Sequence, residues 1–172
     1  MFELKVRNPA SISASDEQHR LERAYKKGAA NEMAEESKFA DERTAYALLR
    51  IVVGINLMMH GVSRMIAGPG EFAAKLVMQF SHAPLPAWSV WFFGLILPSI
   101  ESLFGLLVFI GLRTRAALIA ASLLIAVLTF GSALLEDWAA TGTQLTYALV
   151  YSTLIFLHRY NGYSIDSWMK RR

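Results

Sequence analysis

Four long apolar stretches follow one another from Ala45 toward the C-terminus. A helix needs about 20 mostly apolar residues to cross a bilayer. The pattern therefore predicts four transmembrane helices, at about 45–67, 87–112, 116–135 and 144–160. Turn signals follow the first stretch at Gly68–Gly70 and precede the fourth at Thr141–Thr143. The expected fold is all-α, an integral membrane four-helix bundle over residues 44–172.

The first 43 residues have a different pattern and form a charged arm. Leu21, Tyr25, Ala29 and Met33 make a weak apolar stripe at helical spacing. We expect a helix from Asp16 to Arg43 that contacts partner subunits; a solvated tail without structure is the alternative.

The segment between the first two predicted spans carries its own short pattern. Phe72, Leu76 and Phe80 recur every four residues. This spacing favours a short helix that lies flat on the membrane surface. An ordinary loop is the alternative.

The basic residues indicate how the chain crosses the membrane. If the arm, the turn around 113–115 and the C-terminus share one side, that side holds 14 of the 17 Lys and Arg residues, or 15 when Arg50 near the start of the first span is counted with it. Cytoplasmic segments carry such an excess. We therefore expect a multi-pass protein of the inner (cytoplasmic) membrane with both termini in the cytoplasm.

The composition excludes several classes of function. The chain is 54% hydrophobic with a net charge of +3, and its basic residues flank apolar spans rather than forming one stripe, which argues against a nucleic-acid partner. The chain has no cysteine, which removes disulfides, thiolate metal sites and iron–sulfur clusters. Electron transfer would therefore need a quinone or a cofactor on a partner.

Glu101 is the most unusual residue of the predicted spans. Charged side chains at membrane depth are costly and are usually functional or paired. Glu101 precedes Arg113 by 12 residues, or about 18 Å of helix, which places it near the midplane. Pro98, three residues earlier, should kink the helix and free a carbonyl group nearby.

The first span presents a polar face toward this carboxylate. Asn56 is predicted level with Glu101, and His60 lies about one turn above, so we expect one of them to be its partner. Arg50 is expected to extend its charge to the interface and Arg64 to anchor the outer surface. Two small residues beside this face would let the second helix approach closely: Gly54 and Gly61.

Two interpretations of this cluster stay open. Glu101 either fixes the bundle through hydrogen bonds or, together with His60, exchanges protons with a quinol headgroup. The second makes Glu101 and His60 candidate catalytic residues, and Asn56, His60 and Glu101 candidate quinone contacts. The residues alone favour the structural role. We expect no metal, because His60 and His158 lie near opposite ends of their spans and cannot share a haem iron.

Several short motifs resemble the DoxX family of four-helix membrane proteins. They occur in order at 48–54, 58–64, 101–105, 111–117 and 161–166, and the resemblance covers about Tyr46–Asp166. Relatives often have lysine in place of Arg64, and the arm lies outside the pattern. The resemblance marks these family positions: Arg50, Gly54, His60, Gly61, Glu101, Gly105, Arg113 and Asp166.

The resemblance implies a quinone-linked function. Family members are linked to quinone-dependent oxidoreduction, and the type examples are similar to membrane subunits of a thiosulfate:quinone oxidoreductase. We expect an integral subunit that anchors a larger membrane redox complex, has no covalent cofactor, and contacts lipids and other subunits; whether it catalyses a reaction by itself is left open. One alternative is a stand-alone thiosulfate:quinone oxidoreductase subunit. Another is a small-solute or lipid-binding bundle.

Overall fold

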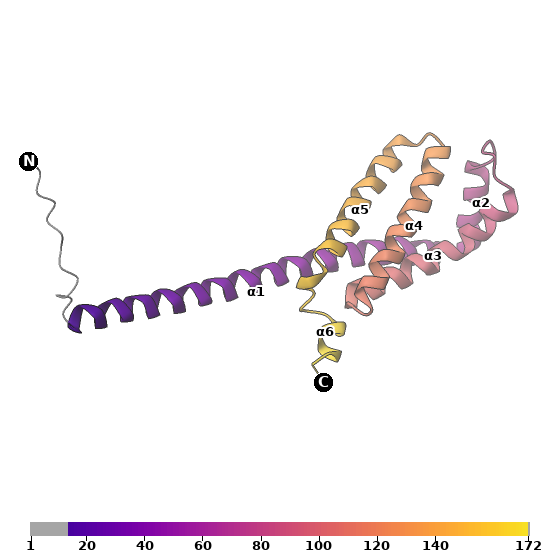
Figure 1. Cartoon of the computed structure of the whole chain (residues 1–172). Helices are drawn as coiled ribbons and strands as arrows, with labels where there is room; N and C mark the ends of the chain where they lie inside the picture. The colour runs from indigo at the N-terminus through magenta and orange to yellow at the C-terminus, as the bar shows by residue number, and fades with distance from the viewer. Residues whose placement is uncertain (1–13, 172) are drawn as a thin grey trace, which may run out of the picture. The chain divides into compact units, whose positions relative to one another are not determined.

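The computed structural model describes residues 14–171, and within them the regular structure is entirely helical (Figure 1). The all-α class expected from the sequence is confirmed. The helices are, in order, α1 (Ala14–Ala67), α2 (Pro69–Gln79), α3 (Ala87–Ile110), α4 (Thr114–Leu134), α5 (Trp138–Phe156), the 3₁₀ turn η2 (His158–Tyr160) and α6 (Ile165–Met169).

The chain divides into two units, of which the first ends at Asp41 and the second begins at Glu42. The described part of the first unit is helical, as the arm pattern predicts, and the helix passes through Gly28 without a break. Its apolar stripe is solvent-exposed, with exposed fractions of 66% for Leu21, 80% for Tyr25 and 66% for Met33. These apolar side chains are therefore available for contact with another molecule.

Three helices of the described chain are long and apolar enough to cross a membrane: α1, α3 and α4. The fourth predicted span is also a helix, but α5 is not among those three. It begins at Trp138 rather than Gln144, because the Asp137 carboxylate accepts a hydrogen bond from the amide of Ala140 (3.0 Å) and caps the helix there. The Thr141–Thr143 segment, predicted as a break, lies inside α5.

The polar residues of α5 fit within a helix because their hydroxyl groups bond to the helix itself. Thr141, Thr143 and Thr146 each donate to the carbonyl oxygen four residues earlier, at 2.8, 3.1 and 3.2 Å. Such bonds satisfy the hydroxyl groups locally. The polar side chains of α5 therefore leave no need for a break at Thr141–Thr143, and the helix packs against α4.

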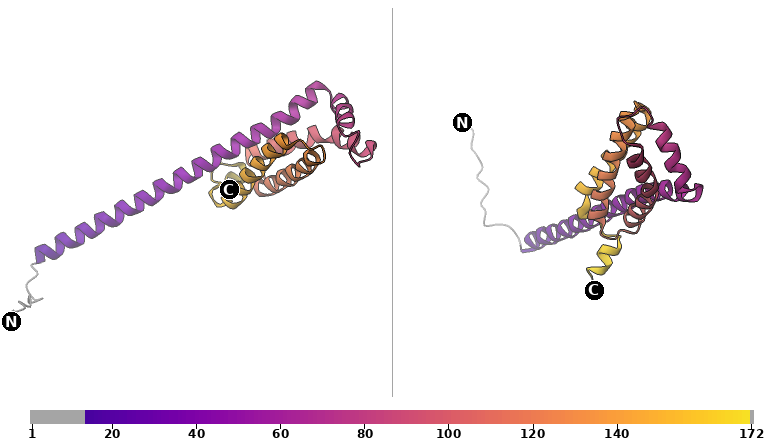
Figure 2. Two further views of the ribbon diagram at one scale, coloured as in Figure 1. Left: turned by 90° about the horizontal axis from the view of Figure 1, so that it is seen from above. Right: turned by 90° about the vertical axis from the view of Figure 1, so that its right-hand side faces the viewer.

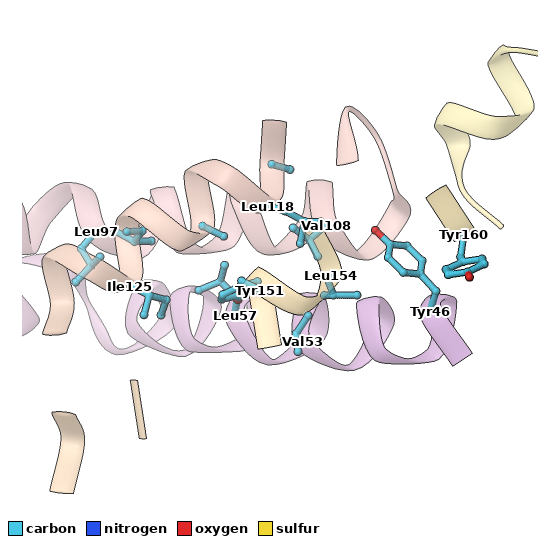
Figure 3. Close-up of a cluster of buried hydrophobic side chains, with 13 residues drawn as sticks. Tyr46, Val53, Leu57, Leu97, Val108, Leu118, Ile125, Tyr151, Leu154 and Tyr160 are labelled. Carbon is cyan, nitrogen blue, oxygen red and sulfur yellow. The ribbon is translucent and has the colours of Figure 1, made fainter. Parts of the chain in front are cut away.

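The core of the second unit lies between the helices α1, α3, α4 and α5. Figure 3 shows Leu57, Val108, Leu118, Tyr151 and Leu154 converging, one or two from each helix. All five are at most 4% exposed. Burial of apolar side chains from four helices makes them one packed unit.

Close approach of α1 to α3 depends on glycines from both helices. A Cβ on Gly105 would lie 2.6 Å from the Met58 Cα, and one on Gly54 would lie 2.7 Å from the Phe109 Cα. A Cβ on Gly61 would collide with the Pro98 carbonyl oxygen and with Ser102. The expectation that Gly54 and Gly61 permit close packing is confirmed.

The short helix expected after the first span is present as α2. Pro69 stands at its start, where a missing amide hydrogen costs nothing. The helix packs on α3 (Figure 2). A Cβ on Gly94 would lie 2.8 Å from the Ala73 Cα. Its orientation in the membrane surface stays a prediction.

Candidate functional site

Glu101 forms an ion pair with Arg64, through Glu101 Oε2 and Arg64 Nη1. The Glu101 side chain is 3% exposed and that of Arg64 is 29% exposed. Arg64 also lies over the Phe72 ring, with its Cζ 4.8 Å from the ring centroid. Two predictions are thus wrong: the partner of Glu101 is neither Asn56 nor His60, and Arg64 is not a simple surface anchor.

The reason for this correction is the register between α1 and α3. Gly105 faces Met58, and Pro98 and Ser102 face Gly61. Glu101 is therefore level with the Gly61 region rather than with Asn56, a shift of five residues or about 7–8 Å along the helix. Heights counted along each helix from its cytoplasmic end do not show this offset, because they assume that both helices start at the same level.

A polar cavity of about 230 Å³ lies beside the ion pair, and we call it the lateral cavity. Asn56, His60 and Thr143 are exposed, whereas Glu101 and Tyr151 are buried. Because the exposed members come from α1 and α5, the cavity opens between these helices at the side of the bundle. Its polar lining residues are Asn56, His60, Arg64, Glu101, Thr143, Gln144, Tyr147 and Tyr151. The three candidate quinone contacts Asn56, His60 and Glu101 thus line one cavity, and their role there stays a prediction.

A second, largely apolar cavity of about 490 Å³ adjoins the lateral cavity, and we call it the apolar cavity. The two share Arg64, Leu128 and Gln144 in their linings. Four phenylalanines line the apolar cavity: Phe72, Phe80, Phe93 and Phe130. A polar chamber next to an aromatic one is typical of sites for small molecules with a polar head and an apolar body.

Gln144 offers an open acceptor within this site. Its Nε2 donates to the Ser132 hydroxyl at 2.9 Å. Its Oε1 is buried and has no hydrogen-bond partner among the described residues. An orphaned buried acceptor is costly, so a ligand group that donates a hydrogen bond would be stabilised here.

The prediction that Arg50 extends its charge to the membrane interface is wrong, because the side chain is buried, at 2% exposure. Its guanidinium donates to the carbonyl oxygens of Val108 (2.8 Å), Phe109 (2.9 Å) and Tyr163 (2.7 Å). The last carbonyl groups of a helix have no partner within it. Arg50 thus caps α3 and fastens the C-terminal segment, which makes it a structural residue.

Asp166 completes this end of the bundle. Its carboxylate accepts hydrogen bonds from the amides of Arg113 and Thr114, both at 2.7 Å, and from the Thr114 hydroxyl at 2.8 Å. Partial burial raises the pKa of Asp166, but the hydrogen bonds from Thr114 and Arg113 outweigh it, so the pKa lies below its ordinary value. Arg113 and Asp166, two positions that the sequence resemblance marks, therefore take part in capping the start of α4.

Sequence reasoning missed Arg64, Gln144, Tyr147 and Tyr151 as members of the site. The last three are spaced by three and four residues, so they share one face of α5. This spacing is the sequence feature from which a shared polar face on α5 could have been predicted. Among residues 14–171, no group of three or more histidine, cysteine, aspartate or glutamate residues is placed to hold a metal ion.

Comparison with known proteins places the chain in a family. A family model described as DoxX matches residues 45–137, which is more than half of the chain and covers α2, α3, α4 and the end of α1. No curated protein matches the chain, and no solved structure matches it. The family match agrees with the motifs around Arg50, His60 and Glu101. With its membrane-spanning helices, the protein is a multi-pass membrane protein that belongs to the DoxX family.

Proposed function

We propose that this protein is an integral membrane subunit of a larger quinone-linked redox complex, and that the lateral cavity holds a quinone headgroup. The observation that carries the proposal is a polar cavity open to the side of a membrane bundle. Exposed polar groups at membrane depth are costly, so Asn56 and His60 need a polar ligand or partner there. A lipid-soluble quinone can reach such an opening by lateral diffusion.

The residues of the site fit a quinone in both of its redox forms. The oxidised ring presents two carbonyl acceptors, for which Asn56, Arg64 and Tyr147 supply donors. The reduced ring presents two hydroxyl donors, for which the open Oε1 of Gln144 is a buried acceptor. The adjoining apolar cavity suits the methyl groups or the start of the isoprenoid chain.

The protein groups would act mainly by positioning and by proton exchange. Glu101 holds Arg64 in place, so Arg64 presents its remaining N–H groups to a ring oxygen. His60, exposed at the opening, is placed to exchange a proton with a ring oxygen and with the surroundings. When bound, the quinone supplies the two-electron, two-proton chemistry. Since the chain has no cysteine, the electrons would come from a cofactor on a partner.

The arm is the second part of the proposal. Its apolar stripe is exposed at Leu21, Tyr25 and Met33. A helix that presents apolar residues at helical spacing is suited to bind along a groove of another protein. We therefore assign partner contact to the arm and quinone contact to the bundle.

Quinone content tests the first part. The protein is purified in mild detergent, and quinone is extracted and quantified per mole of protein. Asn56→Leu and Tyr147→Phe each remove one polar group, and we expect each to lower the quinone content by about tenfold, the effect of one hydrogen bond. Ser152→Leu is the control, because Ser152 is an exposed polar residue of α5 outside the cavity. Unchanged content in both cavity variants would refute the quinone site.

Deletion of residues 1–40 tests the second part. Native mass spectrometry of the detergent extract compares the full chain with the shortened one. We expect the full chain to co-migrate with cofactor-bearing subunits and the shortened chain to remain in the membrane without them. Equal association of both forms would remove the role of the arm and leave the quinone site unaffected.

A further inference from the structure

A third cavity, which we call the basic cavity, lies at the end of the bundle that carries the α3–α4 turn. It has a volume of about 620 Å³ and takes residues from that turn, from η2 and from α6. Its charged lining consists of Arg113, Arg115, Arg159, Lys170 and the single carboxylate of Asp166. It shares no residue with the lateral or apolar cavity, so it does not depend on the proposed function.

The positive charge of this cavity is only partly neutralised within the described chain. Asp166 supplies one negative charge, and its carboxylate accepts hydrogen bonds from the amides of Arg113 and Thr114 and from the Thr114 hydroxyl. In residues 14–171, no salt bridge joins a carboxylate to Arg113, Arg115 or Lys170. Arg159 is engaged by Tyr160, over whose ring its Cζ lies at 4.6 Å. Four cations and one carboxylate therefore line the cavity, which leaves an excess of three positive charges there.

A polar atom in the wall has an open hydrogen-bonding position. Nε2 of His158 is buried and has no hydrogen-bond partner among the described residues, and His158 lines the same cavity. A ligand with several acceptor oxygens would satisfy such a group together with the nearby guanidinium and ammonium groups. Phosphate has the required oxygens and charge.

The surroundings of the cavity favour a lipid as the source of that phosphate. Tyr163 and Trp168 are exposed, at 58% and 55%. Aromatic residues of this kind gather at the membrane–water interface. Met169, 49% exposed, adds an apolar wall to the cavity, which an acyl chain can contact but a free phosphate ion does not need.

From these observations we propose that the basic cavity binds the phosphate of an anionic phospholipid. Basic pockets between membrane helices are suited to such headgroups, because the anionic surface of the membrane adds to the local attraction. Arg115 and Lys170 provide the charge, and His158 provides a hydrogen bond. The bound lipid would hold α6 against the α3–α4 turn.

The test measures lipid retention by native mass spectrometry of the full chain. Protein in mild detergent is titrated with phosphatidylglycerol or phosphatidylcholine. We expect preferential retention of phosphatidylglycerol, and a loss of about tenfold or more in the double variant Arg115→Gln/Lys170→Gln. The control Lys75→Gln/Arg171→Gln removes the same charge at exposed sites outside the cavity and should retain phosphatidylglycerol.

Three results would overturn the proposal. The first is equal retention of both lipids, and the second is equal loss in the control and cavity variants. The third is displacement of phosphatidylglycerol by millimolar inorganic phosphate, which would assign the cavity to a soluble ion. Should the double variant fail to fold, the single variants Arg115→Gln and Lys170→Gln decide the matter, each with a smaller loss expected. Quinone content is unaffected by any of these outcomes.

Discussion

Removal of Arg64 offers the sharpest test of the ion pair in the bundle. In Arg64→Met, the Glu101 carboxyl group loses its counter-ion while its side chain is 3% exposed. Breaking a buried ion pair by removing one partner costs about 3–5 kcal/mol. Because Arg64 itself is 29% exposed, solvent screens the pair and lowers the expected cost. We expect Arg64→Met to reduce the free energy of unfolding by about 3 kcal/mol or less.

A double-mutant cycle separates this charge effect from lost packing. Glu101→Gln keeps the shape of the side chain and removes its charge, so adding it to Arg64→Met should restore part of the lost stability. Groups in direct contact show interaction energies of about 0.5–3 kcal/mol. We expect a value of about 2 kcal/mol for this pair.

Unfolding in mixed micelles provides the measurement. The chain has four tryptophans, whose fluorescence follows unfolding as the fraction of denaturing detergent rises. Lys75→Met is the matched control, because Lys75 is an exposed cation on α2. If the two changes at Arg64 and Glu101 were additive to within about 0.5 kcal/mol, the two residues would not be coupled and the pairing would be refuted.

Two further predictions use the same unfolding assay. Gly105→Ala should cost about 1–3 kcal/mol, because its Cβ would lie 2.6 Å from the Met58 Cα. Gly142→Ala should instead stabilise α5 by about 0.5–1 kcal/mol, since nothing lies within 4 Å of its Cβ; equal effects at both sites would contradict the close contact. The pKa of Asp166 lies below its ordinary value, so its contribution should be complete above about pH 4 and be lost as the pH falls further. Asp166→Asn should cost about 1–2 kcal/mol at pH 7 and remove that acid-dependent loss; an unchanged acid profile would show that Asp166 is not the group responsible.

The amino-acid pattern alone predicts that the fold is all-α, places the helices α1, α3 and α4 that can cross a membrane, and identifies the charged residues within them. Long apolar runs leave few alternatives to helices, because backbone groups in lipid must bond within their own segment. The same reasoning identified Glu101, and the glycine pattern correctly predicted close packing at Gly54 and Gly61. These results depend on local composition and helical spacing alone.

Which polar groups form pairs depends on how the helices pack, and the pairs are known only from the folded structure. The offset between α1 and α3 sets Glu101 beside Arg64 instead of Asn56, and it is fixed by where Gly61 and Gly105 allow the backbones to touch. Arg50 was misjudged for a related reason: its three acceptors are main-chain carbonyl groups, which leave no mark in the sequence. Sliding α1 along α3 by one or two turns leaves the helix propensity of both segments unchanged, but it changes every partner of a long side chain. Pairing in this bundle is therefore a property of packing and not of sequence pattern.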